Sequence, residues 1–315
     1  MLAEQGMEER VAPETLAPCL DAMQQTRARV EQRLAELAPR PHLFGHRVAD
    51  AIGYSLLGGG KRLRPVLTLL TARTLGGDVA LALDPACAVE MVHTASLILD
   101  DLPCMDDAAL RRGKPANHRL YGDDVATLAA VTLVSEAFAV ISRSEGLTDA
   151  LRAELVGLLA DAIGLNGLAG GQASDLAATS SHHDRESLER MEAQKTGTLF
   201  VTSVRIGARV AGADPAEVDA VSRYARHAGL AFQIFDDLLD TFGDGAAIGK
   251  DVEQDTRKAT FSSLMDRRAA EALALERCRS ALGAVVNVHR QHHVLAAFLE
   301  VIIEAYRKQS RPARE

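Results

Sequence analysis

The chain has 315 residues, which allows one large domain or two of ordinary size. Apolar residues make up 47% of it, tryptophan is absent and aromatic residues reach only 4%, a composition that favours a sizeable core built from helices over one built from sheets. The formal net charge of −8 argues against a general nucleic-acid-binding protein, because such a protein needs a strongly basic face.

The four cysteines are far apart in the sequence and form no Cys-x-x-Cys pair. This spacing is typical of reduced thiols rather than of a disulfide scaffold or a zinc site. The first twenty residues contain acids and prolines, and they lack the basic start and the apolar core of a signal peptide. We therefore expect a cytoplasmic protein that binds no nucleic acid.

Helical periodicity dominates along the chain. After roughly 15 N-terminal residues that we expect to be loose, apolar residues recur at steps of three, four and seven over 20–37. The most apolar segment, 125–141, contains Ser135 and Glu136, which interrupt it before the roughly 20 apolar residues needed to cross a bilayer. We interpret this segment as a buried core helix and expect no membrane span.

Further long helices are expected over 151–177, 185–212 and 214–242, the last with Asp214 as N-cap and Pro215 at its first position. The breaks between helices are short, and the last eight or so residues are expected to be loose. The breaks between helices are expected at 57–65, 75–78, 180–184 and 243–251. Since no long linker, repeat or alternating strand pattern interrupts the chain, we predict a single all-α domain over 1–315.

Two groups of aspartates interrupt apolar helical segments. The first follows the apolar stretch 91–99 and reads "DDLPCMD", with Asp100, Asp101 and Asp106. Pro103 disfavours an uninterrupted helix, which lets the chain turn Asp106 back toward Asp100.

The second group, "DDLLD", lies in the apolar stretch 232–240. On a helix Asp236, Asp237 and Asp240 share one end of a face. Like charges on a buried helix repel one another and lose hydration unless a cation compensates them. Carboxylates without His or Cys favour Mg²⁺, which keeps waters and bridges to phosphate.

Basic residues could provide the matching phosphate contacts. "GGGKRLRP" (58–65) places Lys61, Arg62 and Arg64 after three glycines at an expected helix start, where backbone amides and the helix dipole attract anions. The nucleotide-binding P-loop pattern is absent from it. Further cations follow at Arg111, Arg112, Lys195 and Lys250. Any one of them alone would be a solvated surface charge, so only the whole set indicates more than one phosphate group.

Together these motifs resemble the trans-type isoprenyl diphosphate synthases. Matches in type and order include "GGKRLRP", "EMVH", "DDLPCMD", "LRRGKP", "GGQASD", "QKTGTLF", "FQIFDD", "DDLLD" and "GKD", which span about 50–260. The chain is most similar to the bacterial carotenoid-pathway geranylgeranyl diphosphate synthases. The resemblance implies a bundle of long, mostly antiparallel helices around a deep central cavity, usually in a homodimer, and head-to-tail condensation of isopentenyl diphosphate with an allylic diphosphate.

The resemblance also implies roles for individual residues. A cluster of Mg²⁺ ions, three per active site, would bind the allylic diphosphate through Asp100, Asp101, Asp106, Asp175, Asp236, Asp237 and Asp240. The departing pyrophosphate would be stabilised by Arg111, Lys195 and Lys250, and the allylic site would be completed by Thr196 and Gln233. Isopentenyl diphosphate would be held by Lys61, Arg64, His93 and Arg112, while Gln172 and Asp175 would line the interior.

The residues before the first aspartate group bear on product length. Ala95 and Ser96 lie five and four residues before Asp100, about 6–7.5 Å deeper along a helix. Many relatives that make farnesyl diphosphate carry a bulky residue there, so these small side chains favour the C20 product, geranylgeranyl diphosphate.

Other functions stay open at this point. The chain could make farnesyl or longer polyprenyl diphosphates, or it could be a non-catalytic subunit that modulates an active prenyl synthase. A terpene cyclase is disfavoured because it has no use for a second diphosphate site. A helical interaction scaffold leaves the aspartate groups unexplained.

Overall fold

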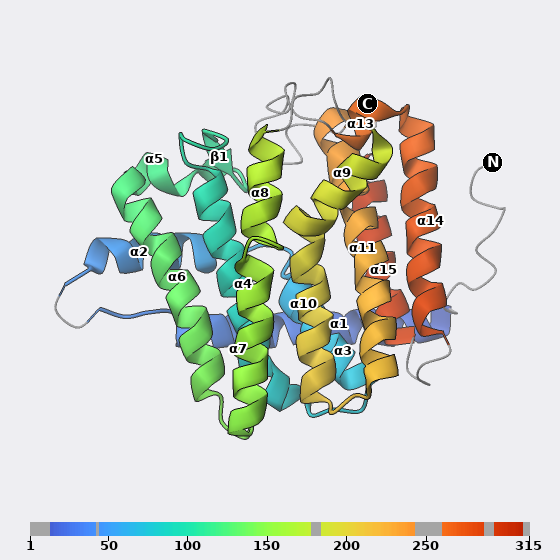
Figure 1. The fold of residues 1–315 in the computed structure, drawn as a ribbon, viewed down its shortest axis with the longest axis horizontal. Coiled ribbons are helices and arrows are strands. Elements are labelled where there is room, and N and C mark those ends of the chain that lie inside the picture. Colours follow the sequence, from blue (N-terminus) through green and yellow to red (C-terminus); the bar gives the residue numbers. More distant parts are fainter. Residues whose placement is uncertain (1–12, 42–43, 178–183, 243–259, 287–292, 311–315) are drawn as a thin grey trace.

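The computed structural model describes residues 13–41, 44–177, 184–242, 260–286 and 293–310 (Figure 1). Its α-helices are α1 (Pro13–Leu37), α2 (His46–Leu56), α3 (Leu63–Thr74), α4 (Val79–Asp100), α5 (Asn117–Tyr121), α6 (Asp123–Arg143), α7 (Asp149–Ile163), α8 (Leu168–Ala177), α9 (Arg185–Glu192), α10 (Thr198–Val210), α11 (Pro215–Phe242), α13 (Phe261–Leu264), α14 (Arg267–Val285) and α15 (His293–Gln309). A π-helical turn, η1 (Ala193–Gly197), joins α9 to α10, and two short strands, β1 (Leu110–Arg111) and β2 (Lys114–Pro115), form an antiparallel hairpin.

The long helices pack side by side, and α1 crosses behind them (Figure 1). α10 lies at the centre, in contact with α3, α4 and α11. One apolar cluster involves mainly α10, α11, α14 and α15, and a second involves mainly α2, α4, α6 and α7. The two helices that carry the aspartate groups, α4 and α11, therefore belong to different clusters and approach each other around α10.

Several sequence predictions about the helices are confirmed. The expected helix over 20–37 lies inside α1, and α11 begins at Pro215 as predicted. Asp214 is its N-cap: its Oδ1 accepts from the Glu217 amide at 2.9 Å, and its own amide donates to Glu217 Oε2 at 3.0 Å. This reciprocal pair satisfies amides that a helix start leaves without intrahelical partners.

The expected continuous helix over 151–177 is wrong, because the chain breaks between α7 and α8. The residues Gly164 and Gly167 lie in this break, and a Cβ at Gly167 would approach the Ala162 carbonyl oxygen to 2.1 Å. Only glycine permits so close an approach between backbone segments. The hairpin formed by β1 and β2 is also absent from the sequence predictions, since two-residue strands leave no alternating pattern.

Three segments are long and apolar enough to cross a membrane when only length and composition are considered: α4, α6 and residues 149–177. In the described structure 67%, 44% and 28% of their respective windows are buried against other helices. Residues 125–141 form a helix within α6 as predicted, but the helix is only partly buried, with Leu128 and Val131 exposed. The absence of a membrane span stays a prediction. The break at 243–251 and most residues of the two ends predicted to be loose lie outside the described residues. Within the described part, helix α1 already begins at Pro13 and α15 continues to Gln309, so both loose ends were predicted slightly too long.

Candidate active site

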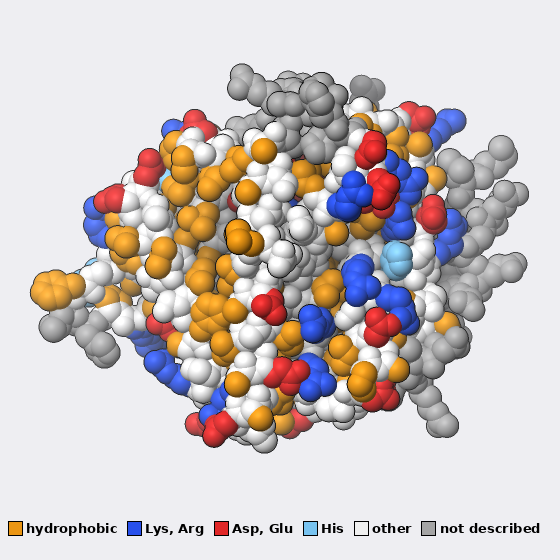
Figure 2. Space-filling model, viewed as in Figure 1, with side chains coloured by type: hydrophobic (Ala, Val, Ile, Leu, Met, Phe, Trp, Pro, Cys, Tyr) orange, Lys and Arg blue, Asp and Glu red, His pale blue; other side chains and the backbone are white. Residues whose placement is uncertain are grey.

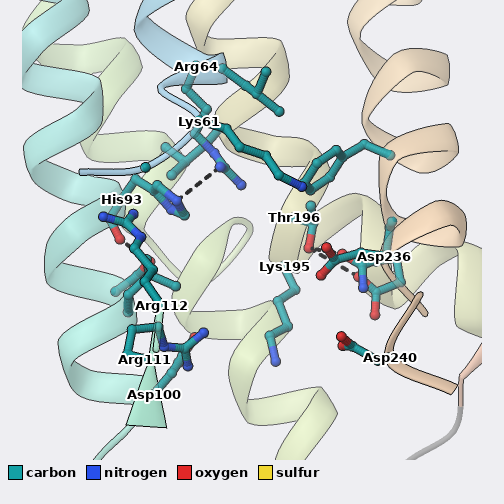
Figure 3. A pocket seen from close by; sticks show the side chains of 18 of the residues that line it. Lys61, Arg64, His93, Asp100, Arg111, Arg112, Lys195, Thr196, Asp236 and Asp240 are labelled. Carbon is teal, nitrogen blue, oxygen red and sulfur yellow. Dashed lines mark hydrogen bonds between the residues drawn. The ribbon is translucent and has the colours of Figure 1, made fainter. Parts of the chain in front are cut away.

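A cavity of about 680 Å³ opens between the C-terminal ends of α4 and α11 (Figure 3). Its wall contains these residues singled out by the sequence: Lys61, Arg62, Arg64, His93, Ser96, Asp100, Asp106, Arg111, Arg112, Gln172, Asp175, Lys195, Thr196, Gln233, Asp236, Asp237 and Asp240. Three residues singled out with them are not on this wall. Asp101 and Ala95 lie behind it, and Lys250 lies outside the described residues.

The first aspartate group forms the end of α4 and the turn after it. The amide of Asp106 donates to the carbonyl oxygen of Asp100 at 2.9 Å, so the turn that brings these two residues together is as predicted. Burial, with the nearby Asp106 charge as a smaller cause, raises the pKa of Asp100 to about 6. Burial disfavours the ionised form of this carboxyl group although Lys195 and Arg111 lie near it.

Asp101 faces away from the cavity and is only 2% exposed. Its carboxylate accepts hydrogen bonds from Arg111, including Nε at 3.0 Å and a still shorter contact from Nη2. In this arrangement the carboxylate orients the Arg111 guanidinium, which does line the cavity. The sequence counted Asp101 among the metal ligands and could not distinguish that role from this one.

The second aspartate group lies on the last turns of α11, across the cavity from Asp100 (Figure 3). The carboxylate of Asp237 accepts from Gln233 Nε2 at 2.8 Å and from the Phe261 amide at 2.9 Å. Burial and the negative charge of Glu192 raise the pKa of Asp237 well above its ordinary value. Like Asp100, it is a buried carboxyl group whose ionised form a bound cation would stabilise.

The described residues contain no group of three His, Cys, Asp or Glu side chains that could hold a metal ion by themselves. Mg²⁺ commonly takes only one or two carboxylates from the protein and completes its shell with water and phosphate oxygens. Carboxylates on two facing walls provide that kind of oxygen ligand, and burial raises the pKa of Asp100 and Asp237, whose ionised forms a cation would stabilise. The site therefore fits Mg²⁺ bound together with a diphosphate.

Basic side chains cover the wall nearer α3. Arg64 Nη1 lies 3.1 Å from His93 Nε2, and both residues face the cavity (Figure 3). Burial and the Arg64 charge lower the pKa of His93 well below its ordinary value, so the ring is neutral and accepts this hydrogen bond. Burial also lowers the pKa of Arg64 to about 10. Lys61 lies over the Phe232 ring with Nζ 5.5 Å from its centroid.

The π-helical turn η1 places two further polar side chains on the wall. Lys195 Nζ contacts Asp175 Oδ2 of α8 at 2.5 Å, and Thr196 Oγ1 lies 2.9 Å from Gln233 Oε1. Such π-turns widen a helix and are frequent at functional sites. The sequence identified "QKTGTLF" as a motif, but helical periodicity gave no sign of the extra width.

The sequence reasoning missed Glu192, a wall residue that is 8% exposed. It lies 3.2 Å from the Thr196 hydroxyl, and burial raises its pKa to about 7. Its position one turn before Thr196 was a usable signal. Gln172 also lines the cavity, and neither amide atom of its buried side chain has a hydrogen-bond partner within the described part of the chain.

Comparison with known proteins identifies the family. The family model described as polyprenyl synthetase matches residues 46–297. The chain belongs to the polyprenyl synthetase family. It is 42% identical to a geranylgeranyl diphosphate synthase of Pantoea ananas over 89% of this chain and 93% of that protein. It is also 43% identical to a farnesyl diphosphate synthase of Geobacillus stearothermophilus over 71% of this chain and 77% of that protein.

Solved structures agree with this assignment. A geranyltransferase from Helicobacter pylori, complexed with magnesium and isoprenyl diphosphate, matches with a TM-score of 0.83 and 28% identity over 92% of this chain and 98% of that one. The family, the all-α fold and the prenyltransferase class predicted from the sequence are confirmed. Chain elongation on isoprenyl diphosphate substrates is the activity that these relatives support.

Proposed function

We propose that this protein condenses isopentenyl diphosphate head-to-tail with dimethylallyl, geranyl and farnesyl diphosphates, releasing pyrophosphate and ending at geranylgeranyl diphosphate. This proposal is carried by the observation of one cavity with two different sides. One side has the carboxylates of α4 and α11 facing each other, with Lys195 of η1 near them. The other side has the basic residues Lys61, Arg64 and Arg112 beside neutral His93. Two diphosphates can bind such a cavity at the same time, one through metal and one through direct cationic donors.

The allylic diphosphate is assigned to the side with the carboxylates. Bound Mg²⁺, three ions in our proposal, supplies charge neutralisation and Lewis acidity for the leaving group. Arg111, Lys195 and Lys250 provide further positive charge for the departing pyrophosphate, as preorganised cations do at other leaving groups. Thr196 and Gln233, already hydrogen-bonded to each other, lie next to this site.

Isopentenyl diphosphate is assigned to the basic side. Lys61, Arg64 and Arg112 carry the charge, and neutral His93 leaves the full positive charge of Arg64 to the ligand. Positioning the two substrates in one cavity replaces a bimolecular encounter by an oriented one. No side-chain nucleophile is required.

The reaction balances without a further co-reactant. The allylic carbon–oxygen bond breaks and pyrophosphate leaves with the electron pair. The double bond of isopentenyl diphosphate then forms the new carbon–carbon bond to the allylic cation. Loss of one proton to the released pyrophosphate restores a double bond and gives an allylic diphosphate one isoprene unit longer.

The C20 end point is supported by the small side chain on α4. Ser96 lies on the cavity wall one turn deeper than Asp100, where a growing tail passes it. Ala95 lies behind this wall in the buried core, 1% exposed. No bulky side chain occupies either position, which favours continued growth over termination at C15.

A second copy of the chain is proposed as the partner. Figure 2 shows hydrophobic side chains gathered on the face that includes α6. On this helix Leu128 is 54% exposed and Val131 is 60% exposed, an apolar surface that a monomer leaves in contact with water. Homodimer formation through α6 would bury it. All four cysteines are free thiols, which supports the proposed cytoplasmic location.

The test is elongation by the purified protein. It is incubated with Mg²⁺, labelled isopentenyl diphosphate and each of the three allylic diphosphates separately, and the dephosphorylated products are separated by chain length. A C20 alcohol from all three starters supports the whole proposal. A C15 end point or products beyond C20 would keep the chemistry and overturn the product assignment. Folded protein that elongates no starter would overturn the catalytic proposal in favour of a non-catalytic subunit.

A further inference from the structure

The loop between α2 and α3 has an unusual backbone. Gly59 and Gly60 have φ values of 87° and 137°, and Arg62, which is not a glycine, has φ of 50°. A non-glycine residue in the left-handed region is uncommon and persists where its surroundings hold it there. The loop directly precedes α3 and carries Lys61, so its shape decides where this cation points.

The surroundings that hold Arg62 are three separate elements. Its guanidinium is fully buried and donates from Nε and Nη2 to the two carboxylate oxygens of Glu31 on α1, at 2.9 and 3.1 Å. Nη1 donates to Glu90 Oε1 on α4 at 2.8 Å, and Nη2 also donates to the carbonyl oxygen of Leu56 at the end of α2, at 2.6 Å. We call Glu31, Arg62 and Glu90 the Arg62 ion-pair cluster.

A buried ion pair is weak support for stability, because desolvation offsets most of the attraction. It does fix geometry, since a planar guanidinium with a bidentate partner has one favourable orientation. The Arg62 ion-pair cluster therefore specifies the position of the loop relative to α1, α2 and α4.

Both ends of this cluster lead to residues of the basic wall. On the loop, the neighbours of Arg62 are Lys61 and, two positions on, Arg64, and these two residues line the cavity together with Arg62 and Glu90. On α4, Glu90 lies one turn before His93, whose ring contacts Arg64 at 3.1 Å. The cluster thus connects the backbone that carries Arg64 with the helix that carries His93.

The opposite side of the loop is in contact with Arg112. Its Nη1 donates to the Gly59 carbonyl oxygen, and a Cβ at Gly60 would lie 2.8 Å from its Cζ atom. A displaced loop would therefore move Arg112 together with Lys61. Lys61, Arg64 and Arg112 therefore depend on this one loop conformation, and His93 on α4 contacts one of them, Arg64.

We propose that Arg62 is a positioning residue for isopentenyl diphosphate: its guanidinium is turned to Glu31 and Glu90 and sets the spacing of the side chains assigned to that substrate. These side chains are Lys61, Arg64, His93 and Arg112. This inference rests on the proposed function. It predicts a selective effect, because the two aspartate groups assigned to the allylic diphosphate lie at the ends of α4 and α11, whereas the Arg62 side chain bonds to Glu31, Glu90 and the Leu56 carbonyl oxygen.

The first variants are Glu31→Gln and Arg62→Lys. Glu31 lies outside the cavity wall and its side chain is 31% exposed, so a fold that tolerates Gln there is expected. Either change removes the bidentate contact between charged groups and is expected to raise KM for isopentenyl diphosphate about 10- to 100-fold, the scale of an ångström-sized misplacement. KM for farnesyl diphosphate and kcat at saturation are expected to stay within about twofold.

The chain offers a matched control in Arg33 and Asp84, which also join α1 to α4 by a bidentate ion pair, at 2.7 and 3.0 Å. This pair does not contact the loop, so Asp84→Asn tests the loss of a helix-to-helix ion pair alone. We expect it to leave both KM values unchanged. In addition, Arg62→Gln, which keeps neither the positive charge nor the planar guanidinium group, should have a higher KM for isopentenyl diphosphate than Arg62→Lys.

The outcomes separate the two levels of the proposal. If the unaltered protein elongates no starter, the proposed function fails before any variant is measured. If it elongates but Glu31→Gln behaves like Asp84→Asn, or if both substrates are affected equally, the positioning role is overturned and the proposed function stands. If Arg62→Gln does not fold, the comparison of Glu31→Gln with Asp84→Asn still tests the positioning role of Arg62.

Discussion

Introducing a phenyl ring on the cavity face of α4, by Ser96→Phe, should convert a C20 synthase into one that stops at C15. The Ser96 hydroxyl donates to the His93 carbonyl oxygen at 2.9 Å, and the residue lines the cavity about 6 Å deeper than Asp100 at 1.5 Å of rise per residue. A tail that starts at the carboxylates and grows toward the core has to pass it.

The size of the effect follows from packing. Forcing extra volume into a filled site costs about 1–3 kcal/mol. At roughly 1.4 kcal/mol for each factor of ten in rate, the step from C15 to C20 should slow about 5- to 160-fold. The earlier step from C10 to C15, whose shorter tail stops before the ring, should change little.

The assay uses geranyl and farnesyl diphosphates as separate starters with labelled isopentenyl diphosphate, and compares the two elongation rates of each variant. Ala95→Tyr is measured in parallel, because the sequence predicts a shorter product from that position too. Ala95 is 1% exposed, so a tyrosine there must also displace neighbouring core side chains. The melting temperature of Ala95→Tyr should therefore fall, while that of Ser96→Phe should stay close to that of the unaltered protein.

An unchanged rate from farnesyl diphosphate in Ser96→Phe would refute the reasoning, since it would mean that the tail does not run along this face of α4. Loss of both elongation steps to the same extent would refute it as well, because a local block cannot explain a defect in the shorter chain.

Three further outcomes are expected. Burial raises the pKa of Asp100 from 3.8 to about 6 and that of Glu192 from 4.5 to about 7, so the metal-free protein should lose stability as pH rises between about 4 and 7. Over the same pH range, the gain in melting temperature on adding Mg²⁺ with pyrophosphate should grow. A gain that does not depend on pH would contradict this. Gly207→Ala should destabilise the fold by several kcal/mol in denaturant titrations, because its Cβ would approach the Thr68 carbonyl oxygen to 2.3 Å, whereas Ala at the open position Gly283 should not. Tyr224→Phe should cost about 1 kcal/mol in the same titration through loss of its buried hydrogen bond to the Leu295 carbonyl oxygen at 2.8 Å, and an unchanged midpoint would argue against that bond.

The features that the sequence predicted correctly are those fixed by contacts within a few residues. The capping of α11 by Asp214 and the turn from Asp100 to Asp106 depend on side chains and a proline that are neighbours in the chain. The two aspartate groups were recognisable for the same reason, because charges on an apolar helix stand out within one or two turns.

Partners distant in the chain could not be read in this way. Arg62 pairs with Glu31 and Glu90, which are 31 and 28 residues away, and the sequence gave no reason to prefer these partners over any other acid. The family resemblance placed Asp101 with Asp100 among the metal ligands. Successive residues on a helix point in different directions, however, and Asp101 is turned toward Arg111 of the hairpin.

The sequence by itself determined the all-α class, the family and the chemistry available at the cavity, because these depend on residue type, periodicity and short spacing. Tertiary structure decided which charges face the cavity and which hold them in place. Whether a carboxylate binds a cation or orients an arginine depends on what packs against it. This is set by the contacts among α1, α3 and α4 and by those of α10 with α4 and α11, rather than by any local pattern.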